Sequence, residues 1–337
     1  MDWRHSTGLK WIFVQRKLLK MYSNHTIAVV VPAYNEENLI NKVIETMPAY
    51  VDYIIIVDDA SQDCTVDRIR EHMEGQPDRI ILIQHPVNQG VGGAIATGYI
   101  WCRDHNIDIT GVMAGDAQMD PDDLHALLDP IVRDNADYTK GNRLFTGDAW
   151  NQIPRVRYLG NAALSLLTKI ASGYWRVADS QCGYTAINLR ALKMINWDLM
   201  YKRYGMPNDL LVRLNIYNFR VTDVPVKPIY YSGAKSGIKP LRMIPRLSMF
   251  LLKLFIYRMV QKYIIRDFHP LVFFYAFSAA LLGLFAPVLM GRLLIMWAIN
   301  GRIPPINALT VIVVVITGLQ FLLFAMQFDM EYNKDLC

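Results

Sequence analysis

Carboxylate and amide side chains follow two apolar runs of the sequence, where they could bind a cation or a nucleotide. Asp58 and Asp59 come directly after the run YIIIV, and Asp116 and Gln118 come shortly after the run ITGVM. A carboxylate in such a place can accept a hydrogen bond from a pyrimidine imide N–H or a ribose hydroxyl, or it can cap the helix that follows. Side-chain oxygens two residues apart can converge on one hard cation, and Mg²⁺ or Mn²⁺ often shares its oxygen ligands with substrate phosphates.

Four continuous apolar runs are predicted to be strands that position these side chains. They are Ile27–Val31, Tyr53–Val57, Arg79–Ile83 and Ile109–Met113, and each is followed by polar loop residues and a helical pattern. This alternation is typical of an α/β fold in which a mainly parallel sheet is covered by helices on both faces. Ligands of such sheets bind beyond the carboxyl ends of the strands, which is where the carboxylates lie.

The loop after the first strand argues against a dinucleotide cofactor. A dehydrogenase would place GxGxxG there, so that a pyrophosphate could sit on the helix N-terminus. This chain has VPAYNEEN instead, and its glycine-rich run, Gly90-Val-Gly92-Gly93, follows the third strand. A classical Rossmann cofactor site is therefore not expected.

Six short motifs occur in the order and spacing of glycosyltransferase family 2. They are VPAYNE, VDDASQD, NQGVGGA, AGDAQMDP, GNR and DSQCGY, and together they cover residues 26 to about 240. On these motifs the chain resembles the family, which implies the GT-A fold with its Rossmann-like, mostly parallel sheet. It is most similar to dolichyl-phosphate mannose synthases and bacterial polyprenyl-phosphate glycosyltransferases, whose membrane anchor the C-terminal part also resembles.

The resemblance implies a donor site in the first loops. The residues that would hold the base and ribose of a nucleotide-sugar are Pro32, Tyr34, Glu36, Asp58 and Asp59. Asn88 and the glycines after it would let the backbone approach the nucleotide. Asp116 and Gln118 would bind Mg²⁺ or Mn²⁺, the metal that bridges the diphosphate.

The resemblance also implies an acceptor site. Arg143, in the motif GNR, would contact the acceptor phosphate, and a second arginine for it would be Arg155 or Arg157. Asp179 and Gln181 would line the pocket for the sugar and the acceptor. The predicted catalytic residues are thus Asp116, Arg143, Asp179 and Gln181.

The chain departs from the family pattern at three places. The metal loop reads AGD where the family often has Asp-x-Asp, so Ala114 leaves open how many protein ligands the metal has. A family basic residue near a Gly-x-Ser-Lys pattern corresponds here to Lys235 or Lys239 in SGAKSGIK, and either could meet the diphosphate. Asn208 and Asp209 lie near the acidic base of relatives that glycosylate hydroxyls, and they could equally cap a helix.

Hydrophobicity and basic charge are concentrated near the C-terminus. Pro270–Met290 and Ile306–Phe328 are uncharged and 21 and 23 residues long, enough to cross a bilayer. A pair of buried core helices would carry a polar face, which these lack. The net charge is +5, but residues 1–25 carry +4 and residues 239–268 carry +6, so the remainder carries −5. Clustered Lys and Arg beside a span mark the cytoplasmic side and suit anionic lipid head groups.

Four regions are predicted along the chain. An N-terminal amphipathic segment at 1–25 precedes a GT-A catalytic domain at 26–238, interfacial juxtamembrane helices at 239–268 and two transmembrane helices at 269–330. The first region lies in the membrane interface or packs on the globular domain. Cations of the third region recur about every four residues opposite an apolar face, and they are expected to reach the head groups. These cations are Arg242, Arg246, Lys253, Arg258, Lys262 and Arg266.

Together these features predict a membrane-anchored enzyme of a prokaryotic cell membrane with a cytoplasmic catalytic domain. It would transfer a hexose from a UDP- or GDP-sugar to polyprenyl or dolichyl phosphate, by metal-assisted displacement with inversion. Such an acceptor is already an anion and needs no strong general base. Two alternatives stay open: transfer to a sugar hydroxyl, which extends a glycan, and a non-catalytic GT-A-like membrane scaffold. The four cysteines show no metal or disulfide spacing, nucleic acid is not an expected partner, and a homo-oligomer is compatible with the pattern.

Overall fold

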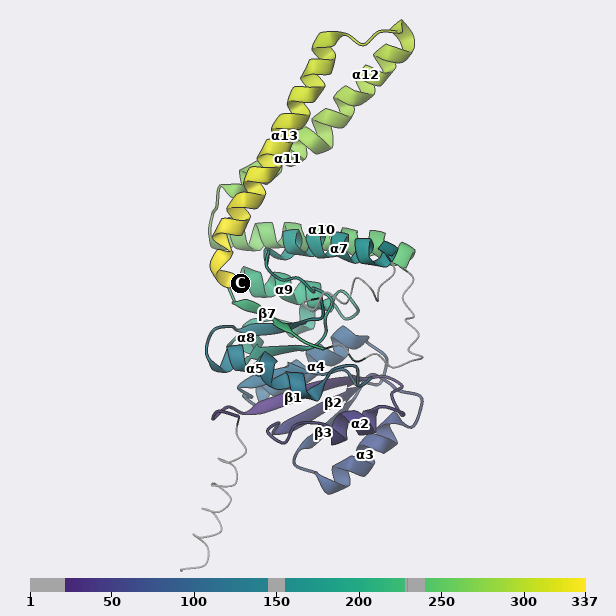
Figure 1. Cartoon of the computed structure of the whole chain (residues 1–337), viewed down its shortest axis with the longest axis vertical. Coiled ribbons are helices and arrows are strands. Elements are labelled where there is room, and N and C mark those ends of the chain that lie inside the picture. Colours follow the sequence, from purple (N-terminus) through teal and green to yellow (C-terminus); the bar gives the residue numbers. More distant parts are fainter. Residues whose placement is uncertain (1–21, 145–154, 228, 230–239) are drawn as a thin grey trace, which may run out of the picture.

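The computed structural model describes residues 22–144, 155–227, 229 and 240–337, with the backbone alone for 155–163 and 240–246. A globular α/β part carries a long helical hairpin (Figure 1). Two further helices lie between the globular part and the hairpin. The predicted N-terminal segment up to residue 21, Lys235 and Lys239 lie outside the described residues.

Seven strands form one mixed sheet in the globular part. In spatial order they are β3 (Ile80–Gln84), β2 (Tyr53–Asp58), β1 (Ile27–Ala33), β4 (Ile109–Val112), β6 (Thr185–Asn188), β5 (Tyr138–Asn142) and β7 (Val221–Pro225). β6 runs antiparallel to both of its neighbours, and every other pairing is parallel. The four predicted strands and the mainly parallel sheet are confirmed.

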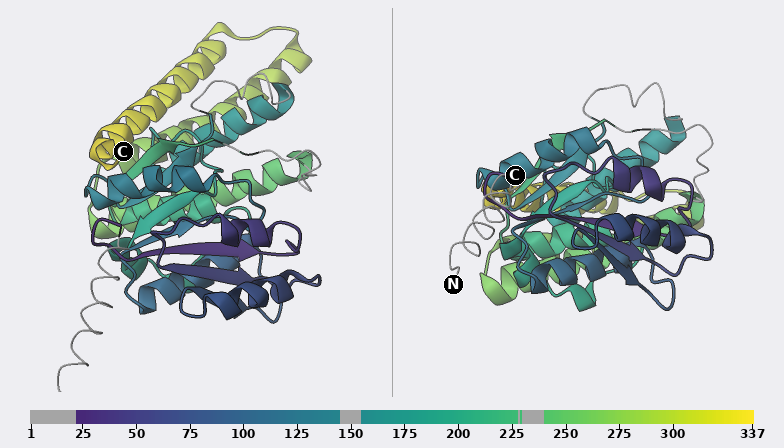
Figure 2. Two further views of the ribbon diagram at one scale, coloured as in Figure 1. Left: turned by 60° about the horizontal axis from the view of Figure 1, so that its bottom comes forward. Right: turned by 90° about the horizontal axis from the view of Figure 1, so that it is seen from below.

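The strands are buried on both faces, which explains their continuous apolar runs. One helical layer consists of α4 (Val91–Asp104), α8 (Leu189–Met194) and α9 (Met206–Ile216), and the other consists of α2 (Ile40–Glu45), α3 (Thr65–Gly75) and α5 (Leu124–Val132). Because successive strand residues point to opposite faces, Val30 joins the first layer and Val29 joins the second. Figure 2 shows the sheet from two further sides, with helices on both faces.

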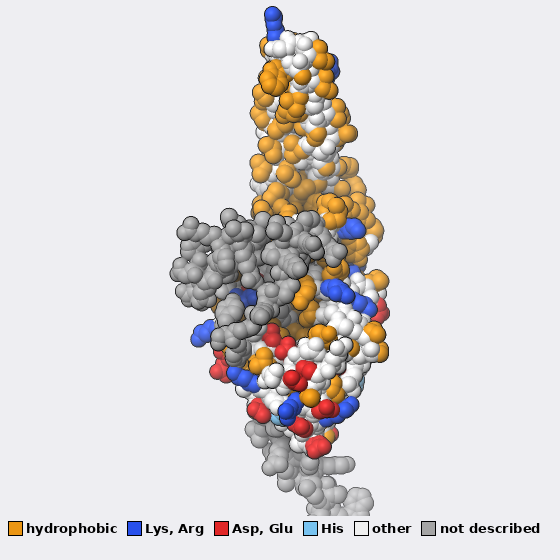
Figure 3. Space-filling view, turned by 90° about the vertical axis from the view of Figure 1, so that its right-hand side faces the viewer, with side chains coloured by type: hydrophobic (Ala, Val, Ile, Leu, Met, Phe, Trp, Pro, Cys, Tyr) orange, Lys and Arg blue, Asp and Glu red, His pale blue; other side chains and the backbone are white. Residues whose placement is uncertain are grey.

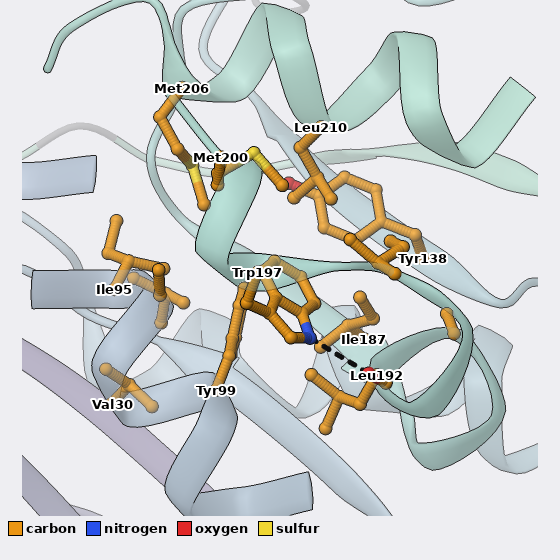
Figure 4. Packing of buried hydrophobic residues seen from close by; sticks show 14 of the residues in the cluster. Val30, Ile95, Tyr99, Tyr138, Ile187, Leu192, Trp197, Met200, Met206 and Leu210 are labelled. Atoms are coloured by element: carbon orange, nitrogen blue, oxygen red, sulfur yellow. Dashed lines mark hydrogen bonds between the residues drawn. The ribbon is translucent and has the colours of Figure 1, made fainter. Parts of the chain in front are cut away.

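Trp197 organises the core of the first layer. Its ring centroid lies 4.7 Å from that of Tyr99, and its Nε1 donates to the carbonyl oxygen of Leu192 at 2.9 Å (Figure 4). The segment of Tyr201 and Lys202, which follows Trp197, then crosses the N-terminus of α4, where Gly93 N donates to Lys202 O at 3.0 Å. A Cβ on Gly92 would lie 2.5 Å from a carbonyl oxygen of this segment, so glycine is required for the close approach.

Two long helices cover the end of the globular part from which the hairpin rises. They are α7 (Arg155–Ser172) and α10 (Pro240–Val260), and α10 continues as the π-helical turn η3 (Gln261–Arg266). Leu251 and Leu254 of α10 pack with Ala171 of α7 and with Val212 and Ile216 of α9. The helical character expected for the juxtamembrane region is thus confirmed.

The hairpin consists of two helices that are long and apolar enough to cross a membrane. α11 (Leu271–Ala280), the π-helical η4 (Leu281–Phe285) and α12 (Ala286–Asn300) form the first, and α13 (Pro305–Tyr332) forms the second. The first helix extends beyond the uncharged stretch to Asn300, so it includes Arg292. Only 22% and 17% of their most apolar windows are buried, which excludes a pair of core helices, and hydrophobic side chains cover the hairpin in Figure 3.

A buried polar cluster, here called the anchor cluster, joins the end of α13 to the globular part. Its members are Arg258, Lys262, Tyr263, Asp329 and Asn333. Arg258 donates to both carboxylate oxygens of Asp329 at 2.8 Å, and Lys262 Nζ donates to Asn333 Oδ1 at 2.7 Å. The expectation that Arg258 and Lys262 reach lipid head groups is therefore wrong. Both side chains point inward because α13 supplies the partners that buried cations require.

Candidate active site

The loops after β1, β2 and β4 meet at the carboxyl edge of the sheet. Asp58, the last residue of β2, is paired with Ala33 at the end of β1. On the other side of β1, Gly115 N donates to Pro32 O at 3.1 Å and brings Asp116 to the same edge. Parallel pairing thus unites residues that lie far apart in the sequence.

Asp58 is buried and keeps one carboxylate oxygen without a described partner. Its Oδ2 accepts a hydrogen bond from Ser61 N at 3.3 Å, whereas among the described residues none donates to Oδ1. An unsatisfied buried acceptor is costly, so a ligand N–H or O–H that reached it would be stabilised. The imide of a pyrimidine base or a ribose hydroxyl has the chemistry to do so.

Asp59 has a different environment from Asp58, because both of its carboxylate oxygens are occupied. They accept hydrogen bonds from Gln89 N at 2.8 Å and Gly90 N at 2.7 Å, at the N-terminus of α4. Asn88 Nδ2 donates to Asp59 O at 3.1 Å. Asp59 does not cap α3, the helix that follows it directly, and instead accepts hydrogen bonds from two amides that immediately precede α4. Asp59 and Asn88 therefore shape the NQG loop.

His85 supports this arrangement and was missed by sequence reasoning. Its Nδ1 lies 2.8 Å from Asp59 Oδ1, and its Nε2 lies 2.9 Å from Thr97 Oγ1 on α4. The available signal was a histidine directly after an apolar strand and three residues before the NQG motif. The buried contact ties the end of β3, the NQG loop and α4 together.

The predicted metal loop is held in a tight turn. Ala117 is buried and adopts a left-handed backbone conformation (φ 54°), and Gln118 N donates to Asp116 Oδ1 at 3.1 Å. A non-glycine residue in this conformation costs about 1 kcal/mol or more, which the surrounding structure must offset. The turn brings the backbone of Gln118 to the carboxylate of Asp116.

The charges around this turn suit a divalent cation. Burial raises the pKa of Asp116. Burial, together with the nearby carboxylates of Asp116 and Asp63, raises the pKa of Glu36 to about 7. No set of three acidic, histidine or cysteine side chains suited to a metal occurs among the described residues. Asp116 and Gln118 nevertheless fit Mg²⁺ or Mn²⁺, which take oxygen ligands and can complete their shells with phosphate and water.

The segment after β7 reaches the metal loop. Ile229 N donates to Gln118 O at 3.1 Å. This contact holds Ile229 against the loop of Asp116 and Gln118. Tyr34, another predicted donor-site residue, is 45% exposed on the loop after β1.

The predicted acceptor residues Arg143 and Asp179 form an ion pair. Arg143 Nε and Nη2 donate to the two carboxylate oxygens of Asp179 at 2.8 and 3.2 Å. Gln181 N donates to Asp179 Oδ1 at 3.3 Å, and its Nε2 donates to Asn208 Oδ1 at 3.2 Å. Arg155 and Arg157 lie in the first turn of α7, whose side chains in this turn are not described. The structure therefore gathers Arg143, Asp179 and Gln181 at one place.

Lys140 lies beneath this ion pair and was also missed. Its side chain is fully buried, and its Nζ donates to Cys182 O and faces Asp179 and Asp223. Burial alone would raise the pKa of Asp179, but Arg143 and Lys140 outweigh it and hold that pKa below its usual range. The only signal in the sequence was a lysine inside a short strand, before GNR.

The proposed donor and acceptor halves of the site are linked by the segment between Gln181 and β6. Tyr184 Oη donates to Asp120 O at 2.9 Å, and Met119 Cε lies 3.4 Å from the place of a Cβ on Gly183. The segment DSQCGY therefore packs against the metal loop. A ligand that spans both halves would follow this segment.

Comparison with known proteins identifies the family. Residues 28–195 match the family described as glycosyl transferase family 2. The UDP-N-acetylglucosamine–dolichyl-phosphate N-acetylglucosaminyltransferase of Methanococcus voltae is 34% identical over 223 residues, 62% of this chain and 88% of that protein. The chain belongs to glycosyl transferase family 2. It is a glycosyltransferase, and its recognition from six motifs is confirmed.

The chain is also similar to a further curated protein and to a solved structure. The undecaprenyl-phosphate mannosyltransferase of Micrococcus luteus is 27% identical over 59% of this chain and 82% of that protein. A solved glucosyl-3-phosphoglycerate synthase of Mycobacterium tuberculosis, in complex with Mn²⁺, UDP and phosphoglyceric acid, has 19% identity and a TM-score of 0.52, over 70% of this chain and 79% of that one. This likeness shows that the fold is shared, as the GT-A resemblance implied.

Proposed function

We propose that this family 2 enzyme transfers a hexose from a UDP- or GDP-sugar to a polyprenyl or dolichyl phosphate at the cytoplasmic membrane surface. One observation carries the proposal: a relative named for transfer from UDP-N-acetylglucosamine to dolichyl phosphate is 34% identical, and the chain covers 88% of it. The relative from M. luteus is named for transfer to undecaprenyl phosphate. The apolar hairpin supports an acceptor that is itself a membrane lipid.

In the proposed donor site, the nucleotide lies across the loops after β1, β2 and β4. Asp58 Oδ1 would accept a hydrogen bond from the base or ribose, next to Pro32, Tyr34 and Glu36. Asp59 and Asn88 would act through the NQG loop that they hold.

Asp116 and Gln118 would hold Mg²⁺ or Mn²⁺, which when bound stabilises the charge of the leaving diphosphate. The same class of ion accompanies UDP in the synthase of M. tuberculosis. The half-buried carboxylates of Glu36 and Asp116 support the assignment, because a cation would offset their mutual repulsion. Lys235 or Lys239, in the segment that follows Ile229, would neutralise the rest of the diphosphate.

In the proposed acceptor site, Arg143 turns its guanidinium to the lipid phosphate, with Arg155 or Arg157 as a second contact. An arginine can bind a phosphate through two parallel hydrogen bonds. Asp179 and Gln181 orient Arg143 and line the pocket.

An oxygen of the acceptor phosphate forms the new bond to the anomeric carbon. The bond from that carbon to the diphosphate breaks, and the nucleoside diphosphate leaves with the electron pair. Attack opposite the leaving group inverts the anomeric configuration, and no proton has to be removed from the acceptor.

Asp209 favours a phosphate acceptor over a sugar hydroxyl. Its side chain is buried, and its carboxylate accepts hydrogen bonds from Tyr201 N at 2.9 Å and Arg213 Nε at 2.8 Å. Each of its two carboxylate oxygens thus has a protein donor. This supports a structural role for Asp209 in α9 rather than a contact with an acceptor hydroxyl.

We further propose the four regions given by the sequence, with the catalytic domain at 26–238 and the two spans within 269–330. Both membrane-proximal ends of the hairpin adjoin the globular part, because α10 leads into α11 and the anchor cluster fastens the end of α13. The basic residues at 239–268 support a cytoplasmic position for this side.

One assay tests the proposed function. Purified protein in detergent receives labelled UDP-N-acetylglucosamine, UDP-glucose or GDP-mannose together with polyprenyl phosphate and Mg²⁺ or Mn²⁺. Label should enter the lipid fraction with at least one donor, and Asp116→Ala should abolish it. Asp122→Asn is a matched control, because Asp122 is an exposed carboxylate in the turn that follows the metal loop. Nucleotide-sugar binding without a lipid product for any donor would refute the proposal.

A further inference from the structure

A surface cavity lies outside the proposed active site. It has a volume of about 390 Å³ and lies between residues 199–202, α9 and α10, and it is here called the α9–α10 cavity. None of the described residues assigned to the nucleotide, the metal or the acceptor phosphate lines it. Asp209, which does line it, is already paired with Arg213.

The inner wall of the α9–α10 cavity is apolar. Met200 and Leu254 are buried, and the ring of Phe250 packs 4.3 Å from that of Tyr201. Tyr257 closes one side, with the Arg213 guanidinium 5.8 Å from its ring centroid. Such walls favour a ligand with an apolar part.

The polar residues that line the cavity are mainly cations. They are Lys202, Arg213 and Lys253, against the single carboxylate of Asp209, which leaves a net charge of +2. Lys202 Nζ donates to Gln89 Oε1 at 2.8 Å, whereas Lys253 is an exposed lysine on α10. The ligand should therefore be an anion as well as partly apolar.

The cavity lies beside an apolar surface at the base of the hairpin. Met249, Leu252 and Ile256 are 57%, 51% and 54% exposed, and their spacing places them on one stripe of α10. Lys253 and Tyr257, which line the cavity, flank this stripe on the helix surface. Figure 1 shows α10 crossing the base of the two apolar helices. An apolar helix face in this position lies in the membrane interface.

We propose that the α9–α10 cavity binds the head group of an anionic phospholipid from the surrounding leaflet. The phosphate is held by Lys253, with Arg213 and Lys202 behind it, and the glycerol backbone lies against Phe250 and Tyr257. The acyl chains stay in the bilayer along the exposed stripe of α10. This inference rests on the proposed membrane anchoring and is independent of the sugar-transfer reaction.

The test measures lipid retention by the full-length protein in detergent, without donor or acceptor. Phosphatidylglycerol and phosphatidylcholine with identical acyl chains are added in equal amounts, and the lipid bound per protein is counted by native mass spectrometry. Phosphatidylglycerol should be retained preferentially, and Lys253→Gln should lower its affinity about fivefold, since one interfacial lysine contributes on the order of 1 kcal/mol. Lys193→Gln, at an exposed lysine of α8 that does not line the cavity, should bind as the parent does.

Three results would overturn the inference. Equal retention of the two lipids would show that charge is not recognised, and unchanged binding in Lys253→Gln would place the lipid elsewhere. Displacement of phosphatidylglycerol by inorganic phosphate or by an equimolar amount of polyprenyl phosphate would assign the cavity to a soluble anion or to the acceptor. A protein that retains phosphatidylglycerol through Lys253 but transfers no sugar would refute the proposed function alone.

Discussion

Two arginine–aspartate pairs with nearly the same geometry occupy opposite environments in this molecule. In each, one guanidinium donates to both carboxylate oxygens, at 2.8 and 3.2 Å for Arg143 with Asp179 and at 2.8 Å twice for Arg258 with Asp329. The Arg143 side chain is 39% exposed, whereas Arg258 and Asp329 are both fully buried. Arg258 also donates to the carbonyl oxygens of Ile170 and Ala171 at 2.9 Å.

The difference shows that a bidentate pair alone does not reveal its role. Protein acceptors surround the Arg258 guanidinium, and its hydrogen bonds join α10 to α7 and α13. The Arg143 side chain is partly exposed, and Lys140 lies behind Asp179, where it would balance that carboxylate if Arg143 turned to a ligand as proposed. Exposure and the partner on the far side are thus the features on which the proposed role of Arg143 differs from the structural role of Arg258.

The largest effect is expected where a buried charge loses its partner. Arg258→Met leaves Asp329 uncompensated and should destabilise the protein by about 3–5 kcal/mol. The matched change Arg143→Met removes a partly exposed arginine and leaves Lys140 beside the buried Asp179, so it should cost less, about 1 kcal/mol. Thermal unfolding of both variants in detergent compares them directly, and equal losses would remove the distinction drawn between the pairs.

For catalysis, in contrast to stability, the change at Arg143 should have a larger effect than the change at Arg258. Arg143→Ala removes the proposed phosphate contact and should lower kcat/KM for polyprenyl phosphate by about 10²-fold, the usual effect of losing one charge-stabilising donor. The dissociation constant of the nucleotide-sugar should change less than about threefold, which titration calorimetry can follow. Equal losses for donor and acceptor would contradict the role of Arg143.

A change at Lys140 should have a smaller effect, and it tests the pair of Arg143 and Asp179 more specifically. Lys140→Met removes the buried charge behind Asp179, so Asp179 should hold Arg143 more firmly and raise the acceptor KM by about tenfold, roughly 1.4 kcal/mol. Asp223→Asn, which removes the opposite charge facing Lys140, should not raise the acceptor KM. A purely structural role for Lys140 would appear as a lower melting temperature without any separation of donor and acceptor KM.

The smallest effect concerns the pH dependence of the anchor cluster. Burial and the neighbouring Arg258 lower the pKa of Lys262 to about 7. The unfolded chain, with a lysine pKa of about 10.4, binds more protons between these values, so stability should rise with pH. The gain from pH 7 to pH 8 should be about 1 kcal/mol at most, and Lys262→Met should flatten the slope of melting temperature against pH. A slope unchanged in this variant would show that other groups cause it.

Much of the sheet and its loops could be predicted because the information is local. Continuous apolar runs predicted β1 to β4, and their parallel order brought Asp58, Asp116 and Gln118 to one edge. The turn at Ala117 then brought the backbone of Gln118 to the carboxylate of Asp116. The assignment of each residue to nucleotide, metal or acceptor remains a prediction that the assays above test.

The remaining features depend on partners far away in the sequence. Asp58 and Asp59 look alike locally, and only the NQG loop, 30 and 31 residues beyond Asp59, decides which carboxylate is occupied. The spacing of cations on α10 likewise cannot distinguish head-group contacts from burial. Arg258 meets its partner 71 residues further along the chain, so its inward position was not visible in the helical pattern.

The position of Asp329 also has a consequence for how the protein is made. Trp175 Nε1 donates to Asp329 Oδ2 at 3.3 Å, and Arg176 Nη1 donates to Cys337 O at 3.2 Å. The ribosome therefore synthesises the sheet and its helices well before the residues that close this end of the globular part. In between, both apolar helices of the hairpin are made. Until the end of α13 docks, Arg258 lacks its counterion, so this end of the globular part should become stable only once the whole hairpin has formed.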